Sequence, residues 1–135
     1  MQSPITDVDP FDLPEWLGTI GVVWRTDSGL GAGHHVRGRL TGSGQDDLTC
    51  DLLAVDEAYP TPVVDDASRL RVHQAWRHGQ VVVGRYDDRL VLAVPGTAFG
   101  PEVVLDVLGR LARAVGAQPD RYAALLRLDD SRRGG

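Results

Sequence analysis

Two histidines and two carboxylates are the residues whose types could support catalysis or metal binding. His34 and His35 end a glycine-rich stretch, Asp51 lies in an expected strand, and Glu57 lies in the loop after it. Imidazole and carboxylate groups act as general acids and bases and as metal ligands. Adjacent strand residues point to opposite faces, so the two histidines would not share one ion. These residues therefore predict at most a composite site, in which a carboxylate such as Asp51 reaches one histidine. Such a site would make the protein a small hydrolase or a metal-dependent enzyme.

The N-terminal segment carries residues that are typical of binding rather than catalysis. It reads D-P-F-D-L-P-E-W-L-G and places Phe11, Leu13, Trp16 and Leu17 close together. Aromatic side chains are common anchors in protein interfaces. Two interpretations stay open, because this cluster either packs across the protein's own sheet or docks on a partner or a second copy.

A basic row is expected on one helix. Arg69, His73 and Arg77 recur at four-residue spacing, with Trp76 beside them. Such a row could hold a phosphate or an acidic partner segment. The alternative is a solvated face whose arginines suit the C-terminal half of a helix. An exposed Trp76 would favour partner binding, and a buried Trp76 would favour the alternative.

Several other chemistries are disfavoured by composition. All 14 basic residues are arginines, which excludes a Schiff-base lysine and a P-loop lysine. The G-L-G-A-G string is followed by an expected strand, whereas a dinucleotide fold needs a helix there. The single cysteine, Cys50, lies on the apolar side of its strand and is expected to behave as a small hydrophobe. We expect no cofactor and no bound metal.

Charge is distributed unevenly along the 135 residues. The net charge is −5, but residues 1–67 hold 12 acids and 3 arginines, or −9, while residues 68–135 hold 7 acids and 11 arginines, or +4. The acidic total argues against nucleic-acid binding. The asymmetry could guide self-association or partner docking, or the halves could neutralise each other in the fold. No apolar run reaches the ~20 residues of a membrane span, and no secretory signal opens the chain, so we expect a cytoplasmic protein.

The stretch from Gln80 to Gly116 predicts how the core is built. Two apolar runs, 81–83 and 90–94, flank Asp87-Asp88 and predict a hairpin that pairs Tyr86 with Arg89. Both faces of this hairpin are apolar, so we expect cover on both sides. A helix should begin at Pro101 and end before Gly116.

The remaining elements follow from alternation and capping signals. Strands are expected at 19–25, 35–41 and 48–55, and a helix from Asp65 or Asp66 to His78. A short helix should start at 118–120, although A-A-L-L-R-L could also form an edge strand. The fold class is α+β, with a mainly antiparallel sheet of about five strands (β-β-β-α-β-β-α-α) and helices mostly on one face. Residues 1–18 form an arm, 19–128 a single domain, and 129–135 a flexible tail.

D-P-F-D-L-P-E-W-L-G, C-D-L-L-A-V-D-E-A-Y-P, L-A-V-P-G and L-A-R-A-V-G-A resemble a family of small uncharacterised proteins of high-GC Gram-positive bacteria. The resemblance covers most of the chain and implies a bacterial cytoplasmic setting, but no activity. The aromatic segment, the split charge and the lack of a convincing catalytic motif instead lead us to expect a non-catalytic protein–protein interaction module, an adaptor, chaperone-like or regulatory protein, with a homodimer as one form. Nucleic acid, membranes and small-molecule ligands are not expected as partners.

Overall fold

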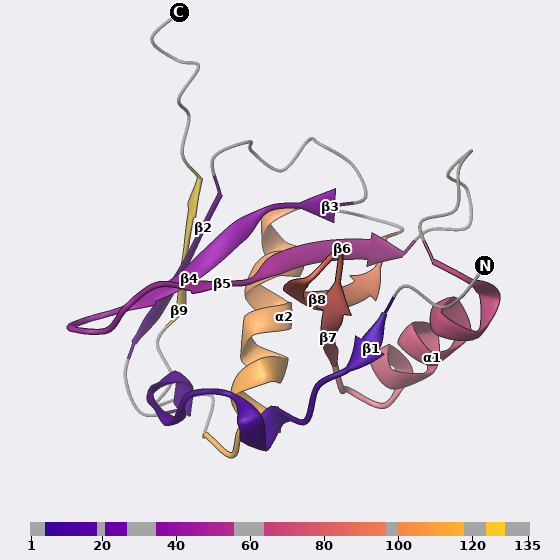
Figure 1. The fold of residues 1–135 in the computed structure, drawn as a ribbon, viewed down its shortest axis with the longest axis horizontal. Coiled ribbons are helices and arrows are strands. Elements are labelled where there is room, and N and C mark those ends of the chain that lie inside the picture. Colours follow the sequence, from indigo (N-terminus) through magenta and orange to yellow (C-terminus); the bar gives the residue numbers. More distant parts are fainter. Residues whose placement is uncertain are drawn as a thin grey trace, which may run out of the picture.

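Two β-sheets and two α-helices make up the described part of the chain (Figure 1). The computed structural model describes residues 5–18, 21–26, 35–55, 64–96, 100–117 and 124–128. The strands are β1 (Thr6–Asp7), β2 (Val22–Thr26), β3 (His35–Val36), β4 (Gly38–Gly42), β5 (Leu48–Thr49), β6 (Asp51–Val55), β7 (Val82–Tyr86), β8 (Arg89–Pro95) and β9 (Ala124–Leu128). The helices are α1 (Asp66–Arg77) and α2 (Pro101–Ala114), and two short 3-10 turns, η1 (Pro10–Asp12) and η2 (Glu15–Gly18), precede β2. The α+β class is thus confirmed.

The strands form two sheets instead of the single sheet expected. The first has the order β1-β7-β8-β6-β3 and the second β5-β4-β2-β9. Only Arg37 separates β3 from β4, and only Cys50 separates β5 from β6. The chain therefore passes directly from β3 into β4 and from β5 into β6, each time crossing from one sheet to the other. The two sheets meet at Arg37 and Cys50, and we call this place the bend.

The β7–β8 hairpin has the register that the sequence predicts. Tyr86 pairs with Arg89, and Val83 pairs with Leu92. Asp87 and Asp88 have φ values of 57° and 61°. This left-handed conformation suits a two-residue hairpin turn, because its twist matches that of the strands.

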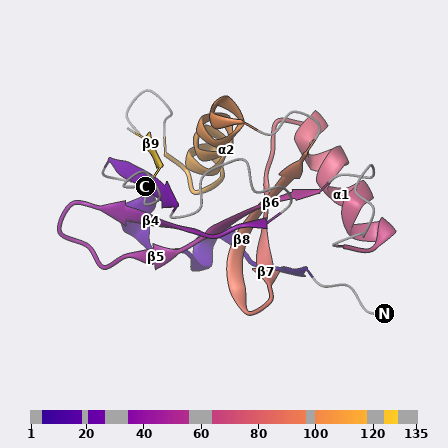
Figure 2. The same ribbon diagram turned by 90° about the horizontal axis from the view of Figure 1, so that it is seen from above.

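Alternating residues of this hairpin enter two separate cores. Leu92 packs with α2 and the second sheet, whereas Val91 packs with Val72 of α1. The hairpin lies between the two helices in Figure 2. The expectation that helices gather on one face is wrong, since α1 and α2 cover opposite faces of the first sheet. The predicted cover on both hairpin faces is confirmed.

Both helices begin and end close to their predicted positions. The Asp65 side chain accepts a hydrogen bond from the Ser68 backbone N–H at 2.8 Å, which caps α1. Gly79 and Gly116 follow the two helices with positive φ values of 76° and 90°. Glycine adopts this conformation without the steric penalty of a Cβ atom.

Residues 124–128 form an edge strand, the alternative that the sequence left open beside a short helix, and the expected helix start at 118–120 lies outside the described residues. β9 pairs in parallel with β2, with Trp24 opposite Leu126. Leu126 packs against the same core as α2, so the segment buries an apolar residue through sheet pairing. Residues 129–135, expected as a tail, lie outside the described residues.

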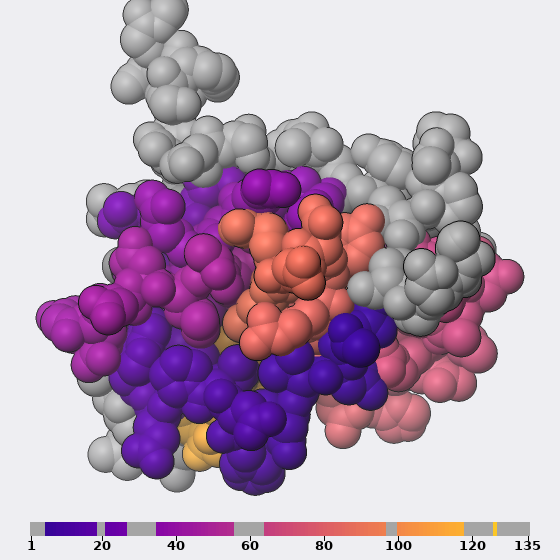
Figure 3. Space-filling view, viewed as in Figure 1, coloured from indigo at the N-terminus to yellow at the C-terminus, as the bar shows by residue number. Residues whose placement is uncertain are grey.

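The N-terminal segment contributes to both cores. Ile5 belongs to the core under α1, and Leu17, with 0% of its surface exposed, belongs to the core under α2. Between them β1 pairs with β7 in antiparallel register, Thr6 opposite Arg85. The space-filling view shows this segment running along the lower edge of the molecule, below the hairpin (Figure 3).

Candidate functional site

The buried carboxylate of Asp51 is the centre of the polar cluster at the bend. Its side chain is 0% exposed, and it accepts hydrogen bonds from Arg89 Nε at 2.7 Å and Arg89 Nη2 at 2.9 Å. His35 Nε2 lies 2.8 Å from Oδ2, and the Gly38 backbone N–H donates to Oδ1 at 3.1 Å. The carboxylate therefore joins β3, β4 and β8 to the first residue of β6.

The electrostatics of this cluster keep Asp51 ionised. Burial acts to raise its pKa, but the hydrogen bonds from Arg89, the Gly38 amide and His35, with the charge of Arg89, outweigh burial and lower the pKa below its ordinary value. The hydrogen bond to Asp51 in turn raises the pKa of Arg89. Burial, and then the neighbouring Asp51 charge, raise the pKa of the Cys50 thiol, which disfavours its nucleophilic thiolate form.

The same residues hold the bend in place. Trp24 Nε1 donates to the Cys50 carbonyl at 2.9 Å, and the Cys50 N–H donates to the Gly38 carbonyl at 3.0 Å. A Cβ atom at position 38 would lie 2.5 Å from the Trp24 ring, so only glycine allows this approach. Asp51 and its partners are thus explained by the need to pair polar groups where two sheets meet.

The polar site expected from the sequence is assembled in part. His35 and Asp51 come together, whereas His34 and Glu57 lie outside the described residues. The imidazole of His35 also packs edge-on against Tyr86, with ring centroids 5.3 Å apart. Nowhere in the described ranges do three or more His, Cys, Asp or Glu side chains gather as a metal site would require.

Arg89 was missed by sequence reasoning. The available signal for Arg89 was Asp51 itself, because a buried aspartate on an apolar strand needs a cation beside it. The cation could not be chosen, because β6 and β8 are distant in sequence and pair in parallel.

The aromatic arm divides into buried and exposed residues. Leu17 is fully buried, and Leu13 and Trp16 are partly buried against the core. Phe11 is 86% exposed. Its backbone N–H donates to Asp9 Oδ1 at 3.0 Å, which caps the η1 turn.

The basic row on α1 does not form one continuous surface. Arg69 pairs with Asp66 one turn earlier, and His73 Nε2 is buried without a hydrogen-bond partner among the described residues. Arg77 is exposed. Trp76 is partly buried, and the Arg110 guanidinium lies 3.4 Å above the centre of its ring. Stacking on Arg110 therefore covers one face of the Trp76 ring.

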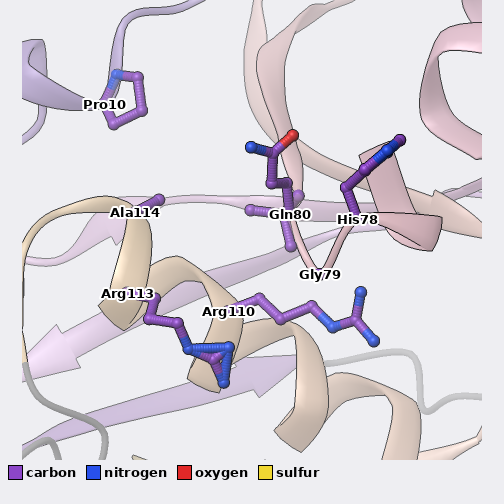
Figure 4. Close-up of a pocket in the computed structure, with 8 residues that line it drawn as sticks. Pro10, His78, Gly79, Gln80, Arg110, Arg113 and Ala114 are labelled. Atoms are coloured by element: carbon purple, nitrogen blue, oxygen red, sulfur yellow. The ribbon is translucent and has the colours of Figure 1, made fainter. Parts of the chain in front are cut away.

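A pocket of about 410 Å³ lies between η1, the loop after α1 and the end of α2. Its lining residues are Pro10, His78, Gly79, Gln80, Val81, Arg110, Arg113 and Ala114. His78 and Gln80 lie across the pocket from Arg110 and Arg113 (Figure 4). We call this the Pro10 pocket. The sequence gave no signal that η1 would lie near Arg110 and Arg113 of α2.

The two arginines of the Pro10 pocket differ in how far they are engaged. Arg110 stacks on Trp76, donates to the Trp76 carbonyl at 2.9 Å and pairs with Asp106 at 3.2 Å. Arg113 is exposed and has no ion-pair partner within the part of the chain that the structure describes. Arg113 is therefore the lining cation with free hydrogen-bonding capacity.

Comparisons with family models, curated proteins and solved structures found no match to this chain. Neither α1 nor α2 has the length and hydropathy of a membrane-spanning helix.

Proposed function

We propose that this chain is a non-catalytic protein–protein interaction module that binds its partner through Phe11 and the Pro10 pocket. The observation that carries the proposal is the 86% exposure of Phe11, a large aromatic residue that follows the pocket-lining Pro10 in the sequence. Exposed aromatic residues next to a pocket are typical anchors of interfaces.

The backbone at Phe11 is held in place before any partner arrives. Asp9 caps the turn, and Pro10 restricts its own φ angle. On one side of the turn β1 is paired with β7, and on the other Leu17 is buried. An anchor fixed in this way loses little conformational entropy on binding, which favours affinity.

The pocket chemistry favours a partner that presents hydrogen-bond acceptors. Arg113 and the Gln80 amide supply donors, and Val81 and Ala114 supply apolar surface. The His78 Nδ1 atom is taken by the Gln74 carbonyl at 2.9 Å, which leaves Nε2 as the other ring position. The partner segment would place an apolar side chain against Phe11 and a carboxylate or carbonyl group against Arg113.

Differential capture from the native cell lysate tests this function. Wild-type protein, Phe11→Ala and Arg113→Gln are immobilised in parallel, with Leu70→Ala as the matched control. Leu70 is 60% exposed on α1 and does not line the pocket, so its removal also deletes an exposed apolar side chain. We expect a lysate protein that is captured by wild type and by Leu70→Ala, and captured in smaller amount by Phe11→Ala and Arg113→Gln. Equal capture by all four proteins would refute the assignment.

A second candidate function rests on the 2.8 Å contact between His35 and Asp51. A carboxylate orients an imidazole for general-base catalysis in many hydrolases. The candidate is a small hydrolase, tested with an activated aryl ester and two variants, His35→Gln and the surface control His78→Gln. Hydrolysis that is lost only in His35→Gln would support it, and equal rates in all three proteins would exclude it.

We also propose a bacterial cytoplasmic setting and, as one form of the interaction, a homodimer. The all-arginine basic composition and the lone buried Cys50 support the setting. Light scattering coupled to size exclusion measures the oligomeric state, and a monomer at all concentrations would rule out the homodimer.

A further inference from the structure

The outer face of the second sheet carries arginines in cross-strand register. Arg25 of β2 lies directly opposite Arg39 of β4 on one side, and on the other side it lies opposite the position of Arg127 in β9. The alternating burial of β2 puts Val22 and Trp24 in the core and leaves Arg25 on the other face. Three neighbouring strands therefore have arginine at one level, and we call Arg25, Arg39 and the Arg127 position the arginine row.

This arrangement is unfavourable for the isolated sheet. Neighbouring strands lie about 4.8 Å apart, and like charges directly opposite each other destabilise a sheet. Within the described ranges Arg39 has one counter-charge, Asp47, with Nε and Oδ2 3.3 Å apart and both side chains well exposed. Arg25 has no ion-pair partner among the described residues, and its buried Nε has no hydrogen-bond partner there. The row thus holds more positive charge than its described neighbours offset.

The charge on this face contrasts with the rest of the N-terminal half. Residues 1–67 are strongly acidic, yet two of their three arginines, Arg25 and Arg39, lie on β2 and β4 of this sheet. The third, Arg37, lies between β3 and β4 and pairs with Asp87 of the hairpin turn at 3.8 Å. Both described helices pack elsewhere, since α2 covers the opposite face of this sheet and α1 covers the first sheet. The local charge is therefore concentrated on an outward-facing side of the sheet.

We propose that the arginine row is a second binding surface, which takes an acidic segment of a protein partner lying across the strands. Guanidinium groups bind carboxylates through paired, charge-assisted hydrogen bonds. The neighbouring positions Thr41 and Thr49 add hydroxyls to the same face. No aromatic residue lies beside Arg25 or Arg39 at the described positions of this face, and aromatic stacking is what single-stranded nucleic acids use. The net charge of −5 also disfavours a nucleic acid.

This surface shares no residue with the Pro10 pocket, so the two proposals fail or succeed separately. The probe is a short fluorescein-labelled polyglutamate peptide, with labelled oligothymidine as the competing class. The variants are Arg25→Gln and Arg39→Gln, and the control is Arg85→Gln, an exposed arginine of β7 in the other sheet. Each variant removes one positive charge, so non-specific attraction changes equally.

We expect wild type to bind polyglutamate in a salt-sensitive manner. Arg25→Gln and Arg39→Gln should each weaken binding about tenfold, the loss expected for one charge-assisted contact. Arg85→Gln should bind like wild type. Urea unfolding supplies a separate readout, because removing like-charge repulsion should leave Arg25→Gln at least as stable as wild type.

Three results would overturn the proposal. The first is no salt-sensitive binding of polyglutamate by wild type, and the second is an equal loss in Arg85→Gln. The third is tighter binding of oligothymidine through the same two arginines, which would assign the surface to nucleic acid.

Discussion

Replacing Asp51 with asparagine tests whether the buried carboxylate holds the two sheets together. Asp51→Asn keeps the shape of the side chain but removes its negative charge. That charge pairs with Arg89 and strengthens the hydrogen bond that the carboxylate accepts from the Gly38 N–H. Breaking a buried ion pair costs about 3–5 kcal/mol when the remaining charge stays buried. The Arg89 side chain is 26% exposed, so water partly compensates its lost partner. We therefore expect a loss of about 2–3 kcal/mol, or a fall in Tm of about 10 °C.

Urea unfolding followed by tryptophan fluorescence measures this change. Trp24 is a suitable reporter because it is buried and because its Nε1 donates a hydrogen bond to the Cys50 carbonyl, where the two sheets meet. The matched control is Asp47→Asn, which breaks the exposed pair with Arg39 and should cost less than about 1 kcal/mol. Equal costs for the two variants would refute the assignment of a special role to burial at Asp51.

The pH dependence gives an independent check on the same carboxylate. The folded-state pKa of Asp51 lies below the unfolded value of about 3.9, so its ionised form stabilises the fold above that value. This contribution is lost as the pH falls from the unfolded pKa through the folded pKa. The asparagine variant lacks it at every pH. The stability gap between wild type and Asp51→Asn should therefore shrink below about pH 4, and a gap that stays constant in acid would contradict the reasoning.

Three further substitutions test the bend, the core and the arm by the same urea titration. Gly38→Ala should lose about 2–3 kcal/mol, because its Cβ would lie 2.5 Å from the Trp24 ring; an unchanged midpoint would show that the ring moves freely. Leu108→Ala removes a 0%-exposed side chain from the buried face of α2 and should lose about 3–4 kcal/mol, and a loss below about 1 kcal/mol would mean that the core collapses around it. Phe11→Ala should stay within about 0.5 kcal/mol of wild type, since the ring is 86% exposed; a larger loss would make Phe11 part of the fold.

Local features of the fold could be predicted from the sequence. The β7–β8 register followed from two apolar runs on either side of Asp87-Asp88, which is a contact between near neighbours. The bounds of α1 and α2 followed from Asp65, Pro101 and the glycines after each helix. These signals act within a few residues, so one sequence is enough to read them.

The pairing of distant strands could not be predicted in this way. β6 pairs with β8 and β2 pairs with β9, both in parallel and both between strands far apart in sequence. The A-L-L-R-L run fits a helix or a strand equally well when considered alone, and only its pairing with β2 decides. The same non-local pairing put the helices on opposite faces and split the sheet in two.

The candidate site was predicted only in part. A carboxylate near a histidine was expected, and Asp51 meets His35. Arg89 was not identified, because its place beside Asp51 depends on the β6–β8 pairing. The Pro10 pocket was missed for the same reason, since it joins residues from η1, the loop after α1 and α2.

The residues best suited to chemistry and those with free interaction capacity lie in different places. Asp51 accepts four hydrogen bonds from Arg89, His35 and Gly38, so its capacity is used in joining the sheets. Phe11 and Arg113 have surface or hydrogen-bond donors that the described fold does not use. A catalytic centre needs reactive groups that remain free to meet a substrate, whereas an interaction module needs exposed groups on a rigid support. This division favours binding over catalysis, and it predicts that substitutions at the bend act on stability while those at Phe11 and Arg113 act on partner capture.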